Sequence, residues 1–263
     1  MFKSFYKYMA KDMNESYHPL LIITAMEMEA DILINKLENK HAKNIYKYTF
    51  YEWTISGYPV VICLSKVNTR NASVATYIAI EKYNPIAIIN PWTAWWHWKV
   101  VHPGDIVIVE DCFNIISWRA QIKAEWEWSN SLERNLLTFS GDSWSAFQLL
   151  NGDTNLIKMA KKIKNPYWKV YVGRIASWDF RNREADKILF LNKEYSTLWE
   201  DMECVAIYDI AHDFNIPALW IKAISNNEIL GEKFDKNMAK VPQEFAYELI
   251  LQIIKNIKHL ANK

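Results

Sequence analysis

The stretch IAIIN, residues Ile86–Asn90, decides the fold class because it contains three β-branched isoleucines and only one polar residue. A run of this kind is typical of a strand that is buried on both faces of a sheet. Two further runs have the same character, LLIIT at Leu20–Thr24 and DIVIV at Asp105–Val109. Strands of this type need helices on both sides of the sheet, and they therefore predict an α/β protein.

Segments with helical periodicity alternate with these strands along the chain. The predicted helices are Met28–Leu37, Asn71–Tyr83, Leu156–Lys164, Arg183–Leu191, Met202–Phe214 and Pro242–Ala261. The further predicted strands are Tyr46–Tyr51, Thr54–Ser56, Val60–Leu64, Val170–Ile175 and Pro217–Ile224, with a tight turn at Ser56-Gly57-Tyr58-Pro59. This order of elements predicts a three-layer α/β/α fold around a central, mixed, twisted sheet.

The chain has 263 residues, and no repeat, low-complexity tract or linker divides it. We expect a local N-terminal extension over residues 1–19 and a single domain over residues 20–263. The 31 basic and 30 acidic residues leave a net charge of +1, so charge alone would not gather nucleic acid or an anionic membrane. No apolar run reaches the length of a membrane span. A small molecule is therefore the expected partner.

The three cysteines, Cys63, Cys112 and Cys204, are odd in number and far apart in the sequence. This spacing argues against a disulfide framework and against a zinc site, and it favours reduced packing residues in the cytoplasm. The two histidines His97 and His102 have no third ligand at a suitable spacing. We therefore expect neither a metal nor a cofactor.

Ligands of α/β proteins gather beyond the carboxyl ends of the strands, so the residues that directly follow each apolar run are candidates for the site. Four segments stand in such places. They are Ala25-Met26-Glu27-Met28-Glu29, Asn90-Pro91-Trp92-Thr93-Ala94-Trp95-Trp96-His97, Glu200-Asp201-Met202-Glu203 and Ile224-Ser225-Asn226-Asn227-Glu228.

In this order, with Asn182-Arg183-Glu184-Ala185-Asp186 between the second and the third, the segments resemble the ligand-contacting stretches of the methylthioadenosine/S-adenosylhomocysteine nucleosidases. These enzymes belong to the purine nucleoside phosphorylase superfamily, and the resemblance covers nearly the whole chain from Leu20. It implies hydrolysis of the N-glycosidic bond of the two nucleosides, with release of adenine and a thio-ribose. It also implies a cytoplasmic homodimer.

The resemblance assigns the carboxylates of the site. Glu29 matches the glutamate that activates the attacking water, and Glu203 matches the one that binds the ribose 2′- and 3′-hydroxyls, with Met202 beneath the sugar. The alternative for both glutamates is a solvated acid in the first turn of a helix, where the helix dipole favours negative charge. Glu27 is expected to be the solvated member of the Glu27 and Glu29 pair.

Other residues of the four segments complete the predicted binding site. Thr93 would hold the water or the sugar through its hydroxyl group and its backbone. Phe180 is a candidate for stacking on the purine, with ordinary core packing as the alternative. The resemblance also places three neighbours of these residues against the substrate, namely Ala94, Asp201 and Ser225.

Two positions depart from the family pattern. The family has an aspartate after Ser225 that protonates the departing purine, whereas this chain has Asn226. An amide cannot deliver a proton, but it can hydrogen-bond to N7 and O6 of a 6-oxopurine. A 6-oxopurine nucleosidase or phosphorylase, acting on an inosine-, guanosine- or futalosine-like substrate, is therefore the alternative. The second departure is Lys222, which replaces an arginine near the water and lacks its planar fork.

A third departure concerns glycine. The family has glycine at the positions of Trp92, Trp95, Trp96 and Trp178, where backbone approaches the ligand closely. The chain has only 6 glycines but 13 tryptophans, and together they make up about 7% of it, the ordinary level of glycine alone. We hypothesise that these tryptophans correspond to codons, most simply UGA, that the source organism reads as glycine. The alternatives are genuine tryptophans or an inactive, nucleoside-binding homologue.

Overall fold

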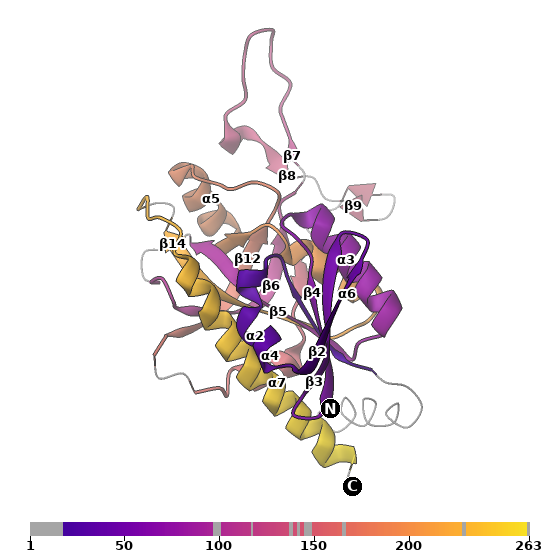
Figure 1. Cartoon of the computed structure of the whole chain (residues 1–263). Coiled ribbons are helices and arrows are strands. Elements are labelled where there is room, and N and C mark those ends of the chain that lie inside the picture. The colour runs from indigo at the N-terminus through magenta and orange to yellow at the C-terminus, as the bar shows by residue number, and fades with distance from the viewer. Residues whose placement is uncertain are drawn as a thin grey trace.

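The computed structural model describes residues 18–96, 101–116, 118–136, 139–140, 143–144, 149–164, 167–227 and 230–261 (Figure 1). Ten strands form the main sheet: β1 (Leu20–Thr24), β2 (Glu38–Ile45), β3 (Tyr48–Ile55), β4 (Tyr58–Leu64), β5 (Ala87–Trp96), β6 (Ile106–Asn114), β11 (Leu149–Asn151), β12 (Val170–Ser177), β13 (Thr197–Asp201) and β14 (Ala218–Asn227). The α-helices are α2 (Asp31–Lys36), α3 (Thr69–Tyr83), α4 (Thr154–Ala160), α5 (Ala185–Tyr195), α6 (Cys204–Asp213) and α7 (Lys240–Ala261). The predicted residues 1–17 of the N-terminal extension lie outside the described residues.

The sheet is mixed, as predicted. Strand β1 pairs in parallel with β4 and β5, and β14 pairs in parallel with β5, whereas β3 is antiparallel to both β2 and β4. Strand β14 also pairs with β6, β6 with β12, β12 with β13, and β13 with β5. Strands β5, β14, β6, β12 and β13 therefore form a closed ring, from which β1, β4, β3 and β2 extend as an open sheet.

The two faces of the sheet carry separate apolar cores, which confirms the three-layer prediction. Leu20 and Ile22 of β1 pack into the core beneath α2, α4 and α7. Leu21 and Ile23 point the other way, into the core beneath α3 and α6. This alternation follows from the two-residue period of a strand. Figure 1 shows α7 running across one face, with α3 and α6 farther to one side.

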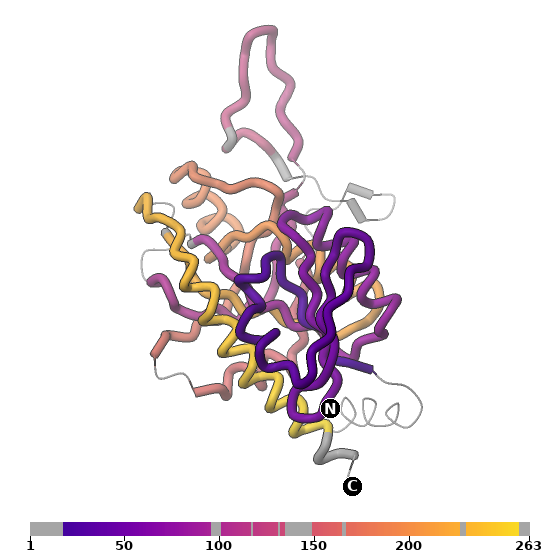
Figure 2. The backbone as a smooth tube through the Cα atoms, viewed as in Figure 1, coloured from indigo at the N-terminus to yellow at the C-terminus, as the bar shows by residue number. Residues whose placement is uncertain are grey.

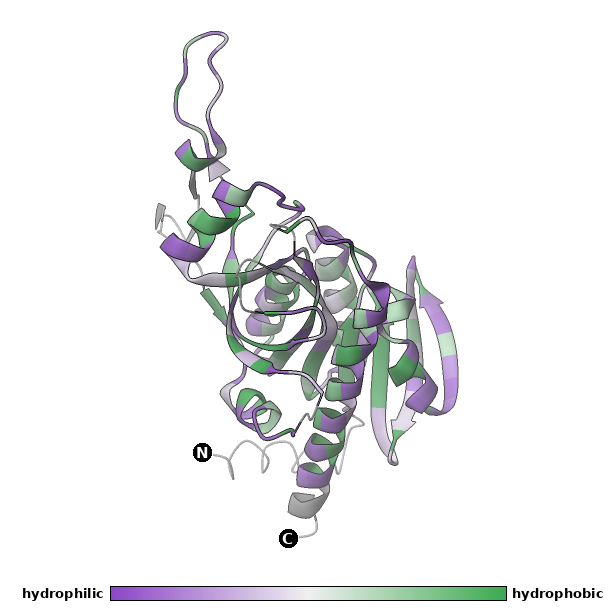
Figure 3. Cartoon of the chain, turned by 90° about the vertical axis from the view of Figure 1, so that its left-hand side faces the viewer, coloured by the Kyte–Doolittle hydropathy of each residue, from purple (hydrophilic) through white to green (hydrophobic). Residues whose placement is uncertain are grey.

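The hairpin from β3 to β4 turns at Ser56 and Gly57, whose φ angles are 51° and 70°. Such a two-residue turn with positive φ at both positions matches the twist of the flanking strands, and it confirms the predicted turn. Strand β3 is continuous, so the predicted break between Tyr51 and Thr54 was wrong. Strand β2 was not predicted, because its sequence ENKHAKNI is polar along an exposed sheet edge (Figure 3).

A long loop over residues 120–134, the arm, leaves the body of the protein between two short strands, β7 (Trp118–Arg119) and β8 (Asn135–Leu136) (Figure 2). The two strands pair antiparallel at the base of the arm. A 3-10 helix, η3 (Ser131–Glu133), precedes β8. Two further short strands follow, β9 (Phe139–Ser140) and β10 (Ser143–Trp144). The arm and these strands were not predicted.

The predicted helices are present, with shifted ends. Helix α3 begins at Thr69 because the Asn68 side chain accepts a hydrogen bond from the backbone N–H of Asn71 at 2.9 Å. It ends where Asn84 adopts φ 43°, in the left-handed region. The acidic segment after β1 divides into a 3-10 turn, η2 (Glu27–Glu29), and α2. No helix in the described ranges is both long and apolar enough to cross a bilayer.

Candidate active site

Three of the four predicted segments meet in one cavity at the carboxyl ends of the strands. The cavity measures about 170 Å³. Its lining residues come from the turn after β1, from the loops after β4 and β12, from β5, from the end of β13 and the residues after it, and from the segment before η4 (Lys236–Ala239). They are Met26, Val67, Trp92, Thr93, Trp95, Arg181, Glu200, Asp201, Met202, Glu203 and Phe234.

Glu29 lies at one end of this region and is fully buried. Its Oε2 accepts a hydrogen bond from the backbone N–H of Met26 at 3.1 Å, and its Oε1 accepts one from the Thr93 hydroxyl at 3.4 Å. Burial raises the pKa of Glu29 to about 8, against the lowering effect of the Met26 N–H and of the positive charge on Lys222. The alternative of a solvated helix-terminal acid does not fit this burial. Glu27 is exposed, as expected.

Glu203 lies at the other end, at the start of α6, and is 2% exposed. Its side chain does not cap the helix. Instead, Oε1 accepts a hydrogen bond from the backbone N–H of Asn68 at 2.9 Å. Burial and the neighbouring charge of Asp201 raise the pKa of Glu203. A buried carboxylate held by one backbone donor is suited to accept hydrogen bonds from sugar hydroxyls.

A buried ion pair lies beneath the cavity. Lys222 Nζ lies 2.8 Å from Asp201 Oδ2 and donates to Asn90 Oδ1 at 2.8 Å. Burial is the largest single influence on the pKa of Lys222 and works to lower it, but the negative charge and hydrogen bond of Asp201, together with other nearby acidic groups, raise the pKa overall. Asp201 also accepts from the backbone N–H of Cys204 at 3.2 Å, so it caps α6. Lys222 is thus a fixed cation close to Glu29 and Glu203.

Sequence reasoning did not predict the cavity-lining residues Val67, Arg181 and Phe234, and it gave no role to Asn68 or Asn90. Asn68 gives a backbone donor to Glu203, and Asn90 gives its side-chain oxygen to Lys222. Asn90 is held in turn by Ile23, whose carbonyl accepts from the Asn90 amide group. The position of Asn68 before a predicted helix is an N-cap signal. Asn90 follows the apolar run of β5, where ligand-side residues are expected.

The fourth segment adjoins the cavity without lining it. Ser225 and Asn226 are buried in β14, and the register of β14 with β5 shifts between Ile224 and Asn226. The Ser225 hydroxyl lies 2.9 Å from Asn226 Oδ1 and 3.3 Å from the carbonyl oxygen of Ala94. The hydroxyl carries one proton, and the shorter contact favours donation to Asn226. The amide nitrogen of Asn226 is then the group that can donate.

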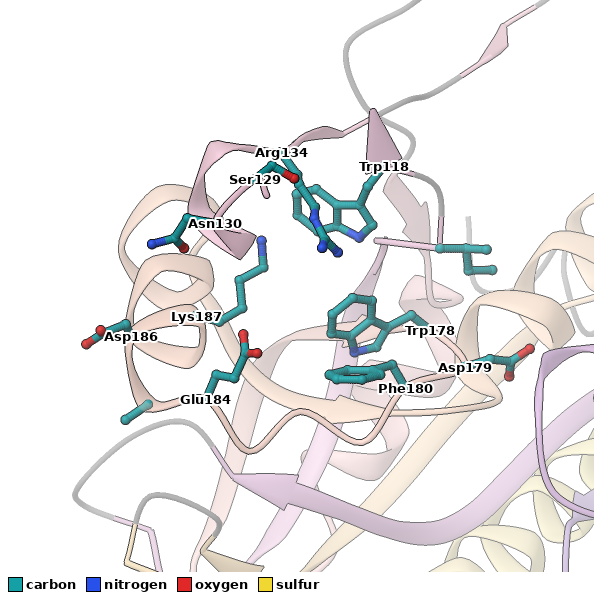
Figure 4. A pocket seen from close by; sticks show the side chains of 12 residues that line it. Trp118, Ser129, Asn130, Arg134, Trp178, Asp179, Phe180, Glu184, Asp186 and Lys187 are labelled. Carbon is teal, nitrogen blue, oxygen red and sulfur yellow. The ribbon is translucent and has the colours of Figure 1, made fainter. Parts of the chain in front are cut away.

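Phe180 lies in a second, larger cavity of about 670 Å³ (Figure 4). Its ring meets the ring of Trp178 edge to face, with centroids 4.9 Å apart. The side chains of Lys187 and Arg134 reach toward the middle of this cavity, and Trp118 forms part of its wall (Figure 4). Phe180 is therefore not brought into the cavity of Thr93 and Glu203, and its stacking on a purine stays a prediction.

From the sequence, His97 and His102 were considered as metal ligands. His97 lies outside the described residues, whereas His102 is described. Across the described ranges, no group of three or more His, Cys, Asp or Glu side chains has an arrangement that could hold a metal ion. The cavity instead has a hydroxyl group, that of Thr93, and the carboxyl group of Glu203 in its wall, and the buried Glu29 lies behind Thr93 without lining the cavity. This set suits activation of a water and recognition of a vicinal diol.

Known proteins are similar in sequence to nearly the whole chain. The profile of the family described as "Phosphorylase superfamily" matches residues 19–255. The 5′-methylthioadenosine/S-adenosylhomocysteine nucleosidase of Bacillus licheniformis is 25% identical to the chain over 252 residues. This alignment covers 90% of the chain and 99% of that protein.

Comparison with solved structures gives the same fold. The 5′-methylthioadenosine/S-adenosylhomocysteine nucleosidase from Neisseria meningitidis, solved with methylthio-immucillin-A, superposes with a TM-score of 0.72 at 23% identity and covers 88% of this chain and 98% of that chain. The futalosine hydrolase of Helicobacter pylori superposes with a TM-score of 0.75 at 16% identity. This superposition covers 90% of this chain and 98% of that chain. Both likenesses extend over nearly the whole domain.

Proposed function

The chain belongs to the phosphorylase superfamily, and we propose that it is a nucleosidase that hydrolyses the N-glycosidic bond of 5′-methylthioadenosine and S-adenosylhomocysteine. The products are adenine and a thio-ribose. The observation that carries the proposal is the presence of two buried carboxyl groups in one region of the protein. Glu29 accepts a hydrogen bond from Thr93, and Glu203 accepts one from the backbone of Asn68. The similarity to the nucleosidase of Bacillus licheniformis supports the substrate class.

The chemistry follows from these positions. In its ionised form Glu29 takes a proton from a water, and the water oxygen forms a bond to C1′ of the sugar. The bond between C1′ and N9 breaks, and its electron pair leaves with the purine. Glu203 accepts hydrogen bonds from the 2′- and 3′-hydroxyls, and Thr93 holds the water or the sugar near Glu29. General-base catalysis of this kind contributes roughly 10²- to 10⁴-fold.

Lys222 has an electrostatic role in this scheme. Its positive charge lowers the pKa of Glu29 and Glu203, and so opposes the effect of burial. Asp201 and Asn90 keep the ammonium group in place at 2.8 Å each. The charge of Lys222 therefore keeps a larger fraction of Glu29 in the ionised form that can accept a proton.

A second candidate function rests on Asn226. With its oxygen accepting from Ser225, the amide nitrogen can donate to N7 or O6 of a 6-oxopurine. This favours an inosine-, guanosine- or futalosine-like substrate, with water or phosphate as the acceptor of the sugar. The leaving purine then depends on water or on another acid for its proton.

A nucleoside panel separates these functions. The protein with glycine in place of its tryptophans is incubated with methylthioadenosine, S-adenosylhomocysteine, inosine, guanosine and futalosine, with and without phosphate, and the free base is measured by chromatography. Release of adenine from the first two without phosphate is the expected result. Release of hypoxanthine or guanine only, or a requirement for phosphate, would favour the second candidate.

We also propose that the enzyme acts in the cytoplasm, as a homodimer, in methionine salvage. The three cysteines Cys63, Cys112 and Cys204 are all buried and unbridged, which suits a reducing compartment. Light scattering after size-exclusion chromatography tests the homodimer, and a monomer at micromolar concentration would contradict it.

A further inference from the structure

Three tryptophans, of which Trp199 and Trp220 are fully buried and Trp178 is partly buried, have a buried indole nitrogen without a partner. The indole N–H groups of Trp178, Trp199 and Trp220 are buried and have no hydrogen-bond partner among the described residues. A buried N–H without a partner is unfavourable, and buried tryptophans normally donate theirs to an acceptor. Only two other side-chain polar atoms in the described ranges share this condition, on Thr197 and Glu200. The misfit is therefore concentrated on one residue type.

The surroundings of two tryptophans are unfavourable in other ways. The ring of Trp220 stacks on Tyr208 with centroids 3.5 Å apart, closer than the roughly 4.5–7 Å of ordinary aromatic pairs. Tyr208 itself is satisfied, since its hydroxyl donates to the carbonyl oxygen of Val109 at 3.2 Å. In the arm, Trp126 has φ 70°, a conformation that glycine adopts at no steric cost and a bulky residue avoids.

Two more tryptophans occupy space in the candidate site. Trp92 and Trp95 line the same cavity as Met202 and Glu203, and Trp92 is 5% exposed. The cavity that remains is about 170 Å³, below the roughly 300–1,000 Å³ of small-molecule sites. The polar groups of a nucleosidase are thus present around a space that is too small for a nucleoside.

We infer that the native protein carries glycine at the positions of these tryptophans, and that its nucleoside chamber is the present cavity enlarged by the volume of the Trp92 and Trp95 side chains. A single substitution rule accounts for the unpaired indoles, the crowded stack, the left-handed backbone and the undersized cavity. Glycine at 92 and 95 also lets a ligand approach the backbone of β5 beside Thr93. The inference does not depend on which nucleoside is cleaved.

The gene and the native protein test the inference directly. We expect TGA codons at positions 92, 95, 126, 178, 199 and 220, and peptides of the native protein with the mass of glycine there. Tryptophan codons of the form TGG at these positions would overturn the inference. TGA codons together with peptides of tryptophan mass would overturn it as well.

Recombinant proteins give a second test with a readout in binding. The tryptophan form is the chain as written, and the glycine form carries glycine at all 13 tryptophan positions. We expect the glycine form to bind methylthioadenosine or inosine at least tenfold more tightly in calorimetric titration. Equal binding by the two forms would contradict the enlarged chamber. Glycine in the native peptides, with no nucleoside bound by either form, would leave this assignment of residues standing and would instead refute the proposed nucleosidase.

Single substitutions provide matched controls for stability. Trp199→Gly and Trp220→Gly are compared with Phe113→Gly, because all three side chains are fully buried. We expect the two tryptophan changes to leave the melting temperature unchanged or raise it, and Phe113→Gly to lower it. A loss of melting temperature as large for the tryptophans as for Phe113 would mark them as genuine core residues.

Discussion

Lys222 Nζ lies 2.8 Å from Asp201 Oδ2 in an ion pair of which neither side chain is more than 2% exposed. A buried pair of this kind contributes little net stability, but removal of one partner leaves the other charge unpaired. In this protein the pair also lies close enough to two carboxyl groups to lower their pKa values. The first prediction follows from this arrangement.

Lys222→Met should raise the pKa of Glu29 further and move the pH profile of kcat/KM to higher pH, because the opposing positive charge is lost. It should also lower the free energy of unfolding by about 3–5 kcal/mol through the unpaired Asp201. Lys222→Arg is the control, since it keeps the charge. An unchanged pH profile in Lys222→Met would show that the charge of Lys222 does not affect the pKa of Glu29.

The pH dependence of the enzyme tests Glu29 directly. A base must be ionised to accept a proton, and the pKa of Glu29 is raised to about 8 by burial. We therefore expect kcat/KM to rise about tenfold for each pH step of one below pH 8 and to level off above it. A profile that is already flat at pH 6 would show that another group is the base.

Glu29→Gln should reduce kcat by roughly 10²- to 10⁴-fold and leave the Kd for the nucleoside nearly unchanged. The measurement is single-turnover kinetics beside calorimetric titration in the glycine form. Parallel loss of rate and affinity would point to a structural role. Thr93→Val serves as a matched control, because it removes the hydroxyl that donates to Glu29 but keeps the carboxylate.

Glu29→Gln should also change how the stability of the protein depends on pH. The pKa of Glu29 is higher in the folded state than its ordinary value, so the folded carboxyl group binds a proton more tightly than the unfolded one. The contribution of Glu29 to the free energy of unfolding is largest below about pH 4.5, falls as the pH rises toward 8, and stays constant above pH 8. Glu29→Gln should therefore be more stable than the parent by a few kcal/mol at pH 9, with little difference at pH 4. Urea denaturation at the two pH values measures this.

Glu203→Ala should weaken ribosides far more than their 2′,3′-dideoxy analogues, because only the ribosides donate hydroxyl protons to this carboxylate. We expect a loss of about 1.5–3 kcal/mol for the riboside, as for a hydrogen bond to a charged group. Inhibition constants for matched pairs of the two ligand types measure the difference. Equal weakening of both types would remove Glu203 from the sugar site.

Asn226→Asp should raise the ratio of adenine-nucleoside to hypoxanthine-nucleoside turnover. The change replaces a donor for O6 by a carboxylic acid that can protonate N7. The ratio of kcat/KM values for methylthioadenosine and inosine in the glycine form gives the result. A ratio that stays the same or falls would show that position 226 does not read the base, even though Ser225 holds it at 2.9 Å.

The sequence was informative where burial dictates residue type. The apolar runs of β1, β5 and β6 predicted buried strands, and the residues that follow them predicted the region of Glu29, Thr93 and Glu203. Strand β13 was missed because it is only five residues long and contains three polar ones. Its pairing with β5, which closes the ring, is a non-local contact that no local pattern reports.

Two features of the site could not be read from side-chain chemistry. The donor to Glu203 is the backbone N–H of Asn68, and every residue except proline has such a group. Phe180 follows a strand, as ligand-side residues do, yet the turn after β12 carries it into the cavity shared with Trp178. The position of Phe180 after a strand predicted the end of the sheet at which it lies, but not the cavity that its side chain enters.

The ring of strands also determines which backbone amides are protected from solvent exchange. One edge of β5 pairs with β1 over Ala87–Ile89 and with β13 over Trp95–Trp96, and the other edge pairs with β14 along nearly the whole strand. Opening β5 therefore requires three pairings to break together, so the amides that donate within these pairings should exchange with deuterium only through global unfolding. The arm over residues 120–134 should exchange faster than β5, because it lies outside the main sheet. In this protein, strand β5 holds Thr93, whereas Glu29 and Glu203 lie outside it, in η2 and at the start of α6.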